Sequence, residues 1–173
     1  VLTHSQLLFW VFRIIMSRRI VESYRAKLAN EEGYVRTSGA ALKIALCYPN
    51  THSIGMANLG LHTMYELFNS IPEVSCERVF LPDSDELKEY ERSGSPLLSL
   101  ETQTPVRDFD VVAFSISFET DYLNMARMLQ LSGIPVWSGE RNHFHPLIVM
   151  GGAASFLNPE PIADFTDIIA VGE

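Results

Sequence analysis

The chain contains 173 residues, of which 47% are hydrophobic and 20% are charged, and its formal net charge is −8. This length fits one domain of ordinary size, and the hydrophobic content is sufficient for a sizeable core. Residues 1–43 carry seven Lys or Arg against three acidic residues, whereas residues 44–173 carry six against eighteen. A body with a net charge of −12 is poorly suited to binding a nucleic-acid backbone, so no nucleic-acid partner is expected.

The two cysteines, Cys47 and Cys76, are too few for a disulfide framework and form no Cys-x-x-Cys pair for zinc. They also cannot hold an iron–sulfur cluster, which needs three or four cysteines. Buried free thiols are typical of cytosolic proteins, so we predict a cytoplasmic location.

The apolar run from Leu7 to Met16 is interrupted by Arg13 and is shorter than the roughly 20 residues that span a bilayer. It also lacks the basic flank and the cleavage site of a signal peptide. We therefore predict no membrane span. We interpret residues 1–15 as upstream sequence that precedes a natural start at Met16. A short amphipathic anchor is the alternative.

Hydrophobic periodicity and turn residues predict alternating helices and strands. In chain order, the predicted elements are a helix at 21–30, a strand at 42–48, a helix at 56–71, a strand at 74–81, a helix at 85–93, a short strand at 97–100, a strand at 110–118, a helix at 121–131, and strands at 147–150 and 167–171. This order favours an α/β fold with a doubly wound, mostly parallel Rossmann-like sheet. Residues 1–41 form a helical amino-terminal extension and linker, and residues 42–173 form the domain.

The loop after the first strand carries the residues of greatest chemical interest in the chain, in the frame Asn50-x-His52-x-x-Gly55. In an open α/β sheet, such a loop lies at the carboxyl edge, where ligands bind. The frame is similar to the Asp-x-His-x-x-Gly loop of cobalamin-binding domains, in which the imidazole is the lower cobalt ligand and the carboxylate supports it. The resemblance implies that His52 is a cobalt ligand supported by the weaker amide of Asn50. The alternative is a loop histidine that is hydrogen-bonded to backbone.

Two later features fall at the same predicted edge. Ser115 and Ser117 end the strand at 110–118, and Gly151-Gly152 closes the strand at 147–150, where glycine permits close approach to a bulky ligand. Alternatively, the hydroxyls satisfy strand-end groups and the glycines form a turn. Glu101, Glu119 and Asp121 also follow strand ends. They either face the cleft or cap helices.

Several sequence blocks, in this order, resemble a known family. They are Tyr48-Pro49, Gly55-Met56-Ala57-Asn58-Leu59-Gly60, Glu77-Arg78-Val79-Phe80-Leu81-Pro82-Asp83, Leu98-Ser99-Leu100-Glu101-Thr102, Phe114-Ser115-Ile116-Ser117-Phe118-Glu119, Gly133-Ile134-Pro135, Gly151-Gly152, Asn158-Pro159-Glu160-Pro161 and Gly172-Glu173. Over residues 42–173, the chain resembles the amino-terminal cobalamin-binding-like domain of uncharacterised radical S-adenosylmethionine (SAM) proteins. In that family, a barrel with a Cys-x3-Cys-x2-Cys cluster motif follows.

The resemblance implies a corrinoid site at residues 49–60, 115–121 and 151–158. Its expected cofactor-binding residues are Asn50, His52, Gly55, Met56, Asn58, Ser115, Ser117, Glu119, Gly151 and Gly152. The SAM and the [4Fe–4S] cluster are expected in a carboxyl-terminal radical SAM domain beyond residue 173, which is the expected partner. This chain lacks the three-cysteine motif, so we do not expect it to be active alone.

The expected chemistry of the parent enzyme is radical-based, including methyl transfer to an unreactive carbon, on a substrate that the sequence does not specify. One alternative is a scaffold or docking domain that keeps the fold without the cofactor. Another is a flavodoxin-like or receiver-like domain. The sequence disfavours this third reading, because it has no acidic cluster after the first strand and no phosphate loop.

Overall fold

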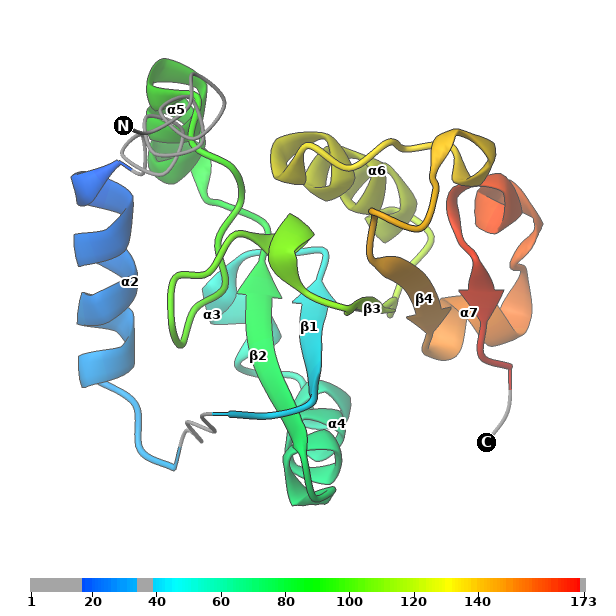
Figure 1. Ribbon diagram of the computed structural model, residues 1–173, viewed down its shortest axis with the longest axis horizontal. Coiled ribbons are helices and arrows are strands. Elements are labelled where there is room, and N and C mark those ends of the chain that lie inside the picture. The colour runs from blue at the N-terminus through cyan, green and yellow to red at the C-terminus, as the bar shows by residue number, and fades with distance from the viewer. Residues whose placement is uncertain (1–16, 34–38, 172–173) are drawn as a thin grey trace, which may run out of the picture.

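The computed structural model describes residues 17–33 and 39–171 and shows an α/β fold built on one parallel sheet (Figure 1). The strands are β1 (Leu42–Tyr48), β2 (Val74–Phe80), β3 (Val111–Ser115), β4 (Leu147–Gly151) and β5 (Ile168–Ile169). Their order in the sheet is β2-β1-β3-β4-β5, and every described pair is parallel. The predicted doubly wound α/β class is therefore confirmed.

Helices cover the sheet on both sides. The described helices are α2 (Arg18–Ala29), α3 (His52–Gly55), α4 (Leu59–Ser70), α5 (Ser84–Ser93), α6 (Asp121–Ser132) and α7 (Ala153–Leu157), with 3₁₀ turns η1 (Val106–Asp108), η2 (Ser138–Glu140) and η3 (Glu160–Phe165). Because β1 leads to β2 and β3 leads to β4 in opposite directions across the sheet, right-handed crossovers place α4 and α6 on opposite faces.

Two helix ends follow the predicted signals. Asp83 caps α5 in a capping box with Glu86, as the stretch Pro82-Asp83-Ser84 predicts. Gly133 ends α6 in the left-handed conformation, with φ of 70°, which glycine adopts without a steric penalty. These local rules predict where α5 begins and where α6 ends.

The predicted strand at 97–100 is wrong. Within the described residues, this stretch forms only one isolated antiparallel bridge, between Leu98 and Pro105. The backbone N–H of Leu100 donates to the carbonyl of Arg78 at 2.8 Å, so the segment covers the outer edge of β2. The segment at 97–100 is therefore apolar because it is buried against β2, and not because it pairs as a strand of the sheet. The polar loop expected before residue 56 also differs, since residues 52–55 form the short helix α3.

Helix α2 packs against α5, as Figure 1 shows. Its buried residues Ile20, Tyr24 and Leu28 belong to the same core cluster as the strands of the sheet. The Tyr90 hydroxyl donates to the Tyr24 hydroxyl at 3.0 Å, and the Lys27 ammonium pairs with Glu86 at 2.6 Å. The described part of the extension is thus built into the domain core. The boundary at residue 42 stays a prediction.

Residues 1–16 lie outside the described part of the chain, and so do the interpretations of residues 1–15 as upstream sequence or as an anchor. Among the described residues, no helix combines the length and the apolar composition that crossing a bilayer requires.

Candidate functional site

The carboxyl edge of the sheet between β1 and β3 is the place where this fold offers a ligand site. The chain passes from β1 to β2 on one side of the sheet centre and from β3 to β4 on the other. The order in which strands are added across the sheet therefore reverses between β1 and β3. In open α/β sheets, ligands bind beyond the strand ends at such a switch point. The segments that follow β1, β3 and β4 carry the predicted site residues, and they end at this same edge because the strands are parallel.

At this switch point, the side chains of Tyr48, Asn58 and Ser117 come together. The Asn58 amide nitrogen lies 3.3 Å from the Tyr48 hydroxyl and 3.3 Å from the Ser117 hydroxyl, and the two hydroxyls are 3.4 Å apart. Tyr48 is the last residue of β1, Asn58 is the N-cap of α4, and Ser117 follows β3. The structure thus brings together the predicted residues Asn58 and Ser117 and adds Tyr48 to them.

His52 makes different contacts. Its Nε2 lies 2.7 Å from a carboxylate oxygen of Glu31, and its ring meets Phe80 edge to face at 5.1 Å between centroids. The Asn50 side chain instead accepts from the backbone N–H of Thr51 at 2.9 Å. The expected support of His52 by Asn50 is therefore replaced by a carboxylate from the segment after α2. This contact occupies one of the two ring nitrogens through which the imidazole could bind a metal.

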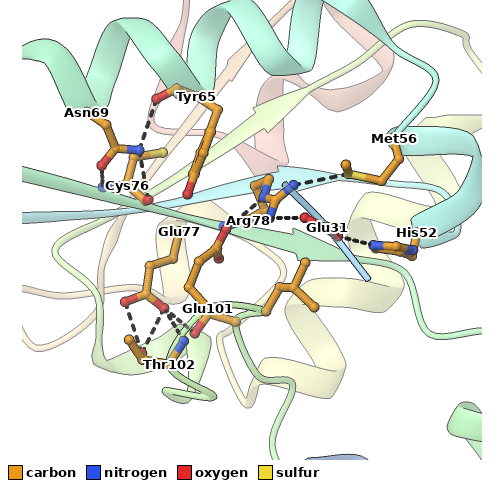
Figure 2. A network of polar contacts seen from close by, with 12 residues as sticks. Glu31, His52, Met56, Tyr65, Asn69, Cys76, Glu77, Arg78, Glu101 and Thr102 are labelled. Carbon is orange, nitrogen blue, oxygen red and sulfur yellow. Dashed lines mark hydrogen bonds and ion pairs between the residues drawn. The ribbon is translucent and has the colours of Figure 1, made fainter. Parts of the chain in front are cut away.

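Glu31 belongs to a buried network centred on Arg78, which Figure 2 shows between Glu31 and Glu101. The Arg78 guanidinium donates to Glu31 and to Glu101 at 2.7 Å each, and the Arg78 backbone N–H donates to Glu101 at 2.7 Å. Its third nitrogen lies 3.1 Å from the sulfur of Met56, and its plane lies over Tyr65 at 4.8 Å. The network therefore links the segment after α2, β2 and the loop that covers the β2 edge.

The neighbouring carboxylate of Glu77 is satisfied by neutral donors. It accepts from the Ser99 hydroxyl at 2.6 Å and from the hydroxyl and the backbone N–H of Thr102 at 2.8 Å and 3.2 Å. Glu77 and Arg78 thus lie side by side on a fully buried strand, with separate sets of partners. Both sets include residues 99–102, so these polar contacts fix the loop that the sequence suggested as a strand.

The hydrogen-bond partners of Glu31 lower the pKa of its carboxyl group. Burial alone would raise its pKa, but the hydrogen bonds from His52 and Arg78 outweigh burial and hold the pKa below its ordinary value of 4.5. For Glu101, which is more deeply buried, desolvation is the largest influence and raises the pKa despite the bonds from Arg78. The pKa values of the two carboxyl partners of Arg78 are therefore shifted in opposite directions.

This difference gives a pH-dependent prediction for Glu31→Gln. Because the folded-state pKa of Glu31 lies below 4.5, its ionised form stabilises the fold above that pH, and this stabilisation is lost as the pH falls through the folded-state value. At pH 7, we expect the variant to lose about 1–3 kcal/mol of unfolding free energy. Urea unfolding of both proteins between pH 7 and pH 3 should show curves that converge in acid. Parallel curves over this range would contradict the assignment.

The predicted glycines have structural explanations in the fold. A Cβ on Gly55 would collide with the ring of Phe80, and a Cβ on Gly152 would collide with the backbone of Ile116. Gly152 also has φ of 114°, which non-glycine residues rarely adopt. A Cβ on Gly151 would make an ordinary contact with Ala170. These contacts show close packing of the turns at the edge, and they leave the predicted role in ligand binding untested.

The predicted acids take different positions. Glu119 is exposed. Asp121 is buried and accepts from the backbone N–H groups of Ser117 and Phe118 at 3.2 Å and 3.0 Å, so it holds the turn after β3. Ser115, the last residue of β3, is half-buried. Among the residues that the structure describes, no group of three His, Cys, Asp or Glu side chains could hold a metal ion.

Large apolar side chains lie exposed on the segments that follow the strands. Leu59 follows β1 and is 80% exposed, and Phe118 follows β3 and is 61% exposed. Further exposed apolar residues on these segments are Ile54, Leu123, Phe156, Leu157 and Val171. Exposed apolar side chains of this kind are candidates for a face that another group covers.

Sequence reasoning missed Tyr48, Glu31 and Arg78. Tyr48 and Arg78 lie in blocks that resemble the family but were assigned no role in the site, and Glu31 was assigned none either. A usable signal existed for Arg78, because the strand Val74–Phe80 contains a Glu-Arg pair in a run that is otherwise typical of a buried strand. Buried charges need partners, and Glu101, the one acidic residue in positions 97–102, is one of the two partners that Arg78 finds.

Comparisons with known proteins give a family match and a distant relative. A family model described as "Radical SAM proteins, N-terminal" matches residues 60–173. The chain is also similar to an uncharacterised protein of Methanocaldococcus jannaschii, with 23% identity over 130 residues. This alignment covers 75% of the present chain and 23% of the relative, so the chain spans less than a quarter of the relative's length.

Proposed function

The chain belongs to the family of radical SAM protein N-terminal domains, and we propose that it is the corrinoid-binding module of a radical SAM enzyme. The association with radical SAM proteins implies SAM and a [4Fe–4S] cluster in the family. The chain has only two cysteines, both buried and free, so the cluster belongs to another part of the parent protein. Its partner in the proposal is a following radical SAM domain, and its location is the cytoplasm.

The observation that carries the proposal is the apolar carboxyl edge. Leu59 and Phe118 flank the switch point between β1 and β3, and Phe156 and Leu157 extend the exposed apolar surface beyond β4. A flat macrocycle buries apolar surface when it binds, and these exposed side chains are the apolar surface that this edge offers to it. When bound, a corrinoid supplies a cobalt centre that can carry a methyl group. The residues of this chain bind and orient its ring and exclude water from the covered face.

The side chains at this edge are better suited to holding the corrin ring than to bonding its cobalt. The Nε2 of His52 is already paired with the carboxylate of Glu31, and its ring packs against Phe80. We therefore propose that the corrinoid lies on the edge without a cobalt bond from His52. Asn58, Ser117 and the apolar residues after β1, β3 and β4 would hold it.

The contact between His52 and Glu31 also favours a second candidate, a docking domain that keeps the fold without a cofactor. In that case, the exposed apolar edge contacts the remainder of the parent protein directly. Both candidates use the same surface, so a direct binding measurement is needed to separate them.

Titration with hydroxocobalamin, followed by visible absorption, tests the proposal. We expect saturable binding that survives His52→Ala, because the imidazole is committed to Glu31. Phe118→Ser should weaken binding about five- to tenfold, since it removes apolar surface that the ring covers. Phe144→Ser is the matched control, because Phe144 is also exposed but precedes β4 at the opposite edge of the sheet. Absence of saturable binding would favour the docking domain.

A further inference from the structure

We infer that Tyr122 is a positioning residue, which joins the apolar side chains after β3 and after β4 into one rigid binding surface. This inference rests on the proposed function, since it names the residue that shapes the same edge. Tyr122 is the second residue of α6, and its side chain is largely buried. Its hydroxyl lies 2.8 Å from the carbonyl oxygen of Asn158 and 3.2 Å from that of Ala154. Tyr122 therefore ties the first turn of α6 to α7.

Helix α7 carries two of the exposed apolar residues that the proposed function uses, Phe156 and Leu157. It is only five residues long, and a helix this short is not stable by itself. Contacts at its two ends therefore determine where these side chains lie. At its start, a backbone N–H of α7 donates to the carbonyl of Ile116 at 3.3 Å. At its end, the Tyr122 hydroxyl donates to the carbonyl of Asn158, the C-cap.

Two further residues in the first turn of α6 hold the other segments of the edge. Asp121 accepts from the backbone N–H groups of Ser117 and Phe118, in the turn after β3. The side-chain amide of Asn124 donates to the carbonyl of Pro49, which follows β1, at 2.9 Å. The first turn of α6 thus contacts the segments that follow β1, β3 and β4.

Tyr122 acts through these segments rather than on a ligand. Its hydroxyl proton is used by the carbonyl of Asn158, and its ring is largely buried. The contact fixes the end of α7 relative to the turn that carries Phe118. A ligand that spans Phe118 and Leu157 therefore meets a surface that is already ordered, and it loses less conformational entropy on binding. Without the hydroxyl, the two parts of this surface move independently.

Hydroxocobalamin is the first probe, in a double-mutant cycle. We expect Tyr122→Phe to weaken its binding about two- to fivefold, which is the effect of one hydrogen bond. In a chain that already carries Phe156→Ser and Leu157→Ser, the same substitution should have almost no effect, because no large apolar side chain is left on α7 to position. An equal loss of affinity in both backgrounds would overturn the inference and leave the proposed function standing.

Tyr90→Phe is the matched control for loss of stability. It also removes a buried tyrosine hydroxyl, which donates to the Tyr24 hydroxyl at 3.0 Å, but Tyr90 lies on α5, outside the segments after β1, β3 and β4. Urea unfolding should show a loss of stability in both variants, whereas only Tyr122→Phe should weaken binding. If Tyr90→Phe weakens binding to the same extent, general destabilisation explains the effect, and the inference is wrong.

Cleavage by chymotrypsin tests the positioning without a ligand. Mass spectrometry compares the rate of cleavage after Phe156 with the rate after Phe144, which is also exposed but precedes β4. We expect Tyr122→Phe to raise this ratio about threefold, since the end of α7 opens more often. An unchanged ratio would overturn the inference. If the wild-type chain does not bind hydroxocobalamin, the corrinoid proposal fails by itself, and a raised ratio would still support Tyr122 as the residue that shapes the apolar surface of a docking domain.

Discussion

A chain that begins at Leu42 is expected to be unfolded at room temperature, whereas a chain that begins at Ser17 is expected to fold. Helix α2 places Ile20, Tyr24 and Leu28 in the common core, each with at most 4% of its surface exposed. Burying one such side chain contributes about 1.5–3 kcal/mol. Removal of all three would cost about 5–9 kcal/mol, and this upper estimate is comparable with the total stability of an ordinary domain, about 5–15 kcal/mol.

Truncation removes polar contacts as well. The chain that begins at Leu42 lacks Glu31, so Arg78 loses one of its two carboxylate partners and His52 loses its hydrogen-bond partner. It also lacks Tyr24, the hydrogen-bond partner of the buried Tyr90 hydroxyl. These losses expose the face of α5 and leave buried charge less well compensated.

The measurement is urea unfolding, followed by far-ultraviolet circular dichroism, of residues 1–173, 17–173 and 42–173. Residues 17–173 serve as the control, because they keep all the described contacts of α2. We expect the first two chains to share one cooperative transition and the third to show none. A cooperative transition at the same midpoint for residues 42–173 would contradict this result and establish the predicted domain boundary at residue 42.

The sheet was most predictable where a strand is buried on both faces, as β2 is along its whole length and β1 is over its last five residues. The run at 42–48 coincides with β1, since apolar residues with turn signals at both ends encode such a strand directly. The same pattern failed at 97–100. There, Leu97, Leu98 and Leu100 are fully buried, but they cover the edge of β2 rather than join the sheet. The apolar composition of a segment predicts that the segment is buried, but it does not predict which strand its backbone pairs with.

The candidate site was predictable only in part. The sequence placed Asn58 and Ser117 at one edge, because parallel strands share their carboxyl end, and the structure brings these two side chains together. It did not reveal the pairing of His52 with Glu31, which lies 21 positions earlier in the chain. No local pattern encodes that contact, since it depends on how α2 packs against the rest of the domain. This contact is also what separates binding of the corrinoid ring from ligation of its cobalt by His52.

Replacement of Arg78 with Met is expected to destabilise the domain by about 3–5 kcal/mol, because it leaves two carboxylates without their buried cation. The side chain of Glu101 has no exposed surface, and that of Glu31 is also largely buried. Neither carboxylate can recover full hydration without opening the structure. The effect should therefore appear as a large decrease in the urea midpoint at pH 7.

Two variants identify the cause of this destabilisation. Lys88→Met removes an exposed ion pair with Asp85 and should leave the midpoint unchanged, since exposed pairs contribute little. In Arg78→Met combined with Glu101→Gln, the deeper uncompensated charge is absent, so the double variant should be more stable than Arg78→Met alone. If the second substitution adds its own loss instead, then lost packing over Tyr65, rather than unpaired charge, is the main cost of removing Arg78.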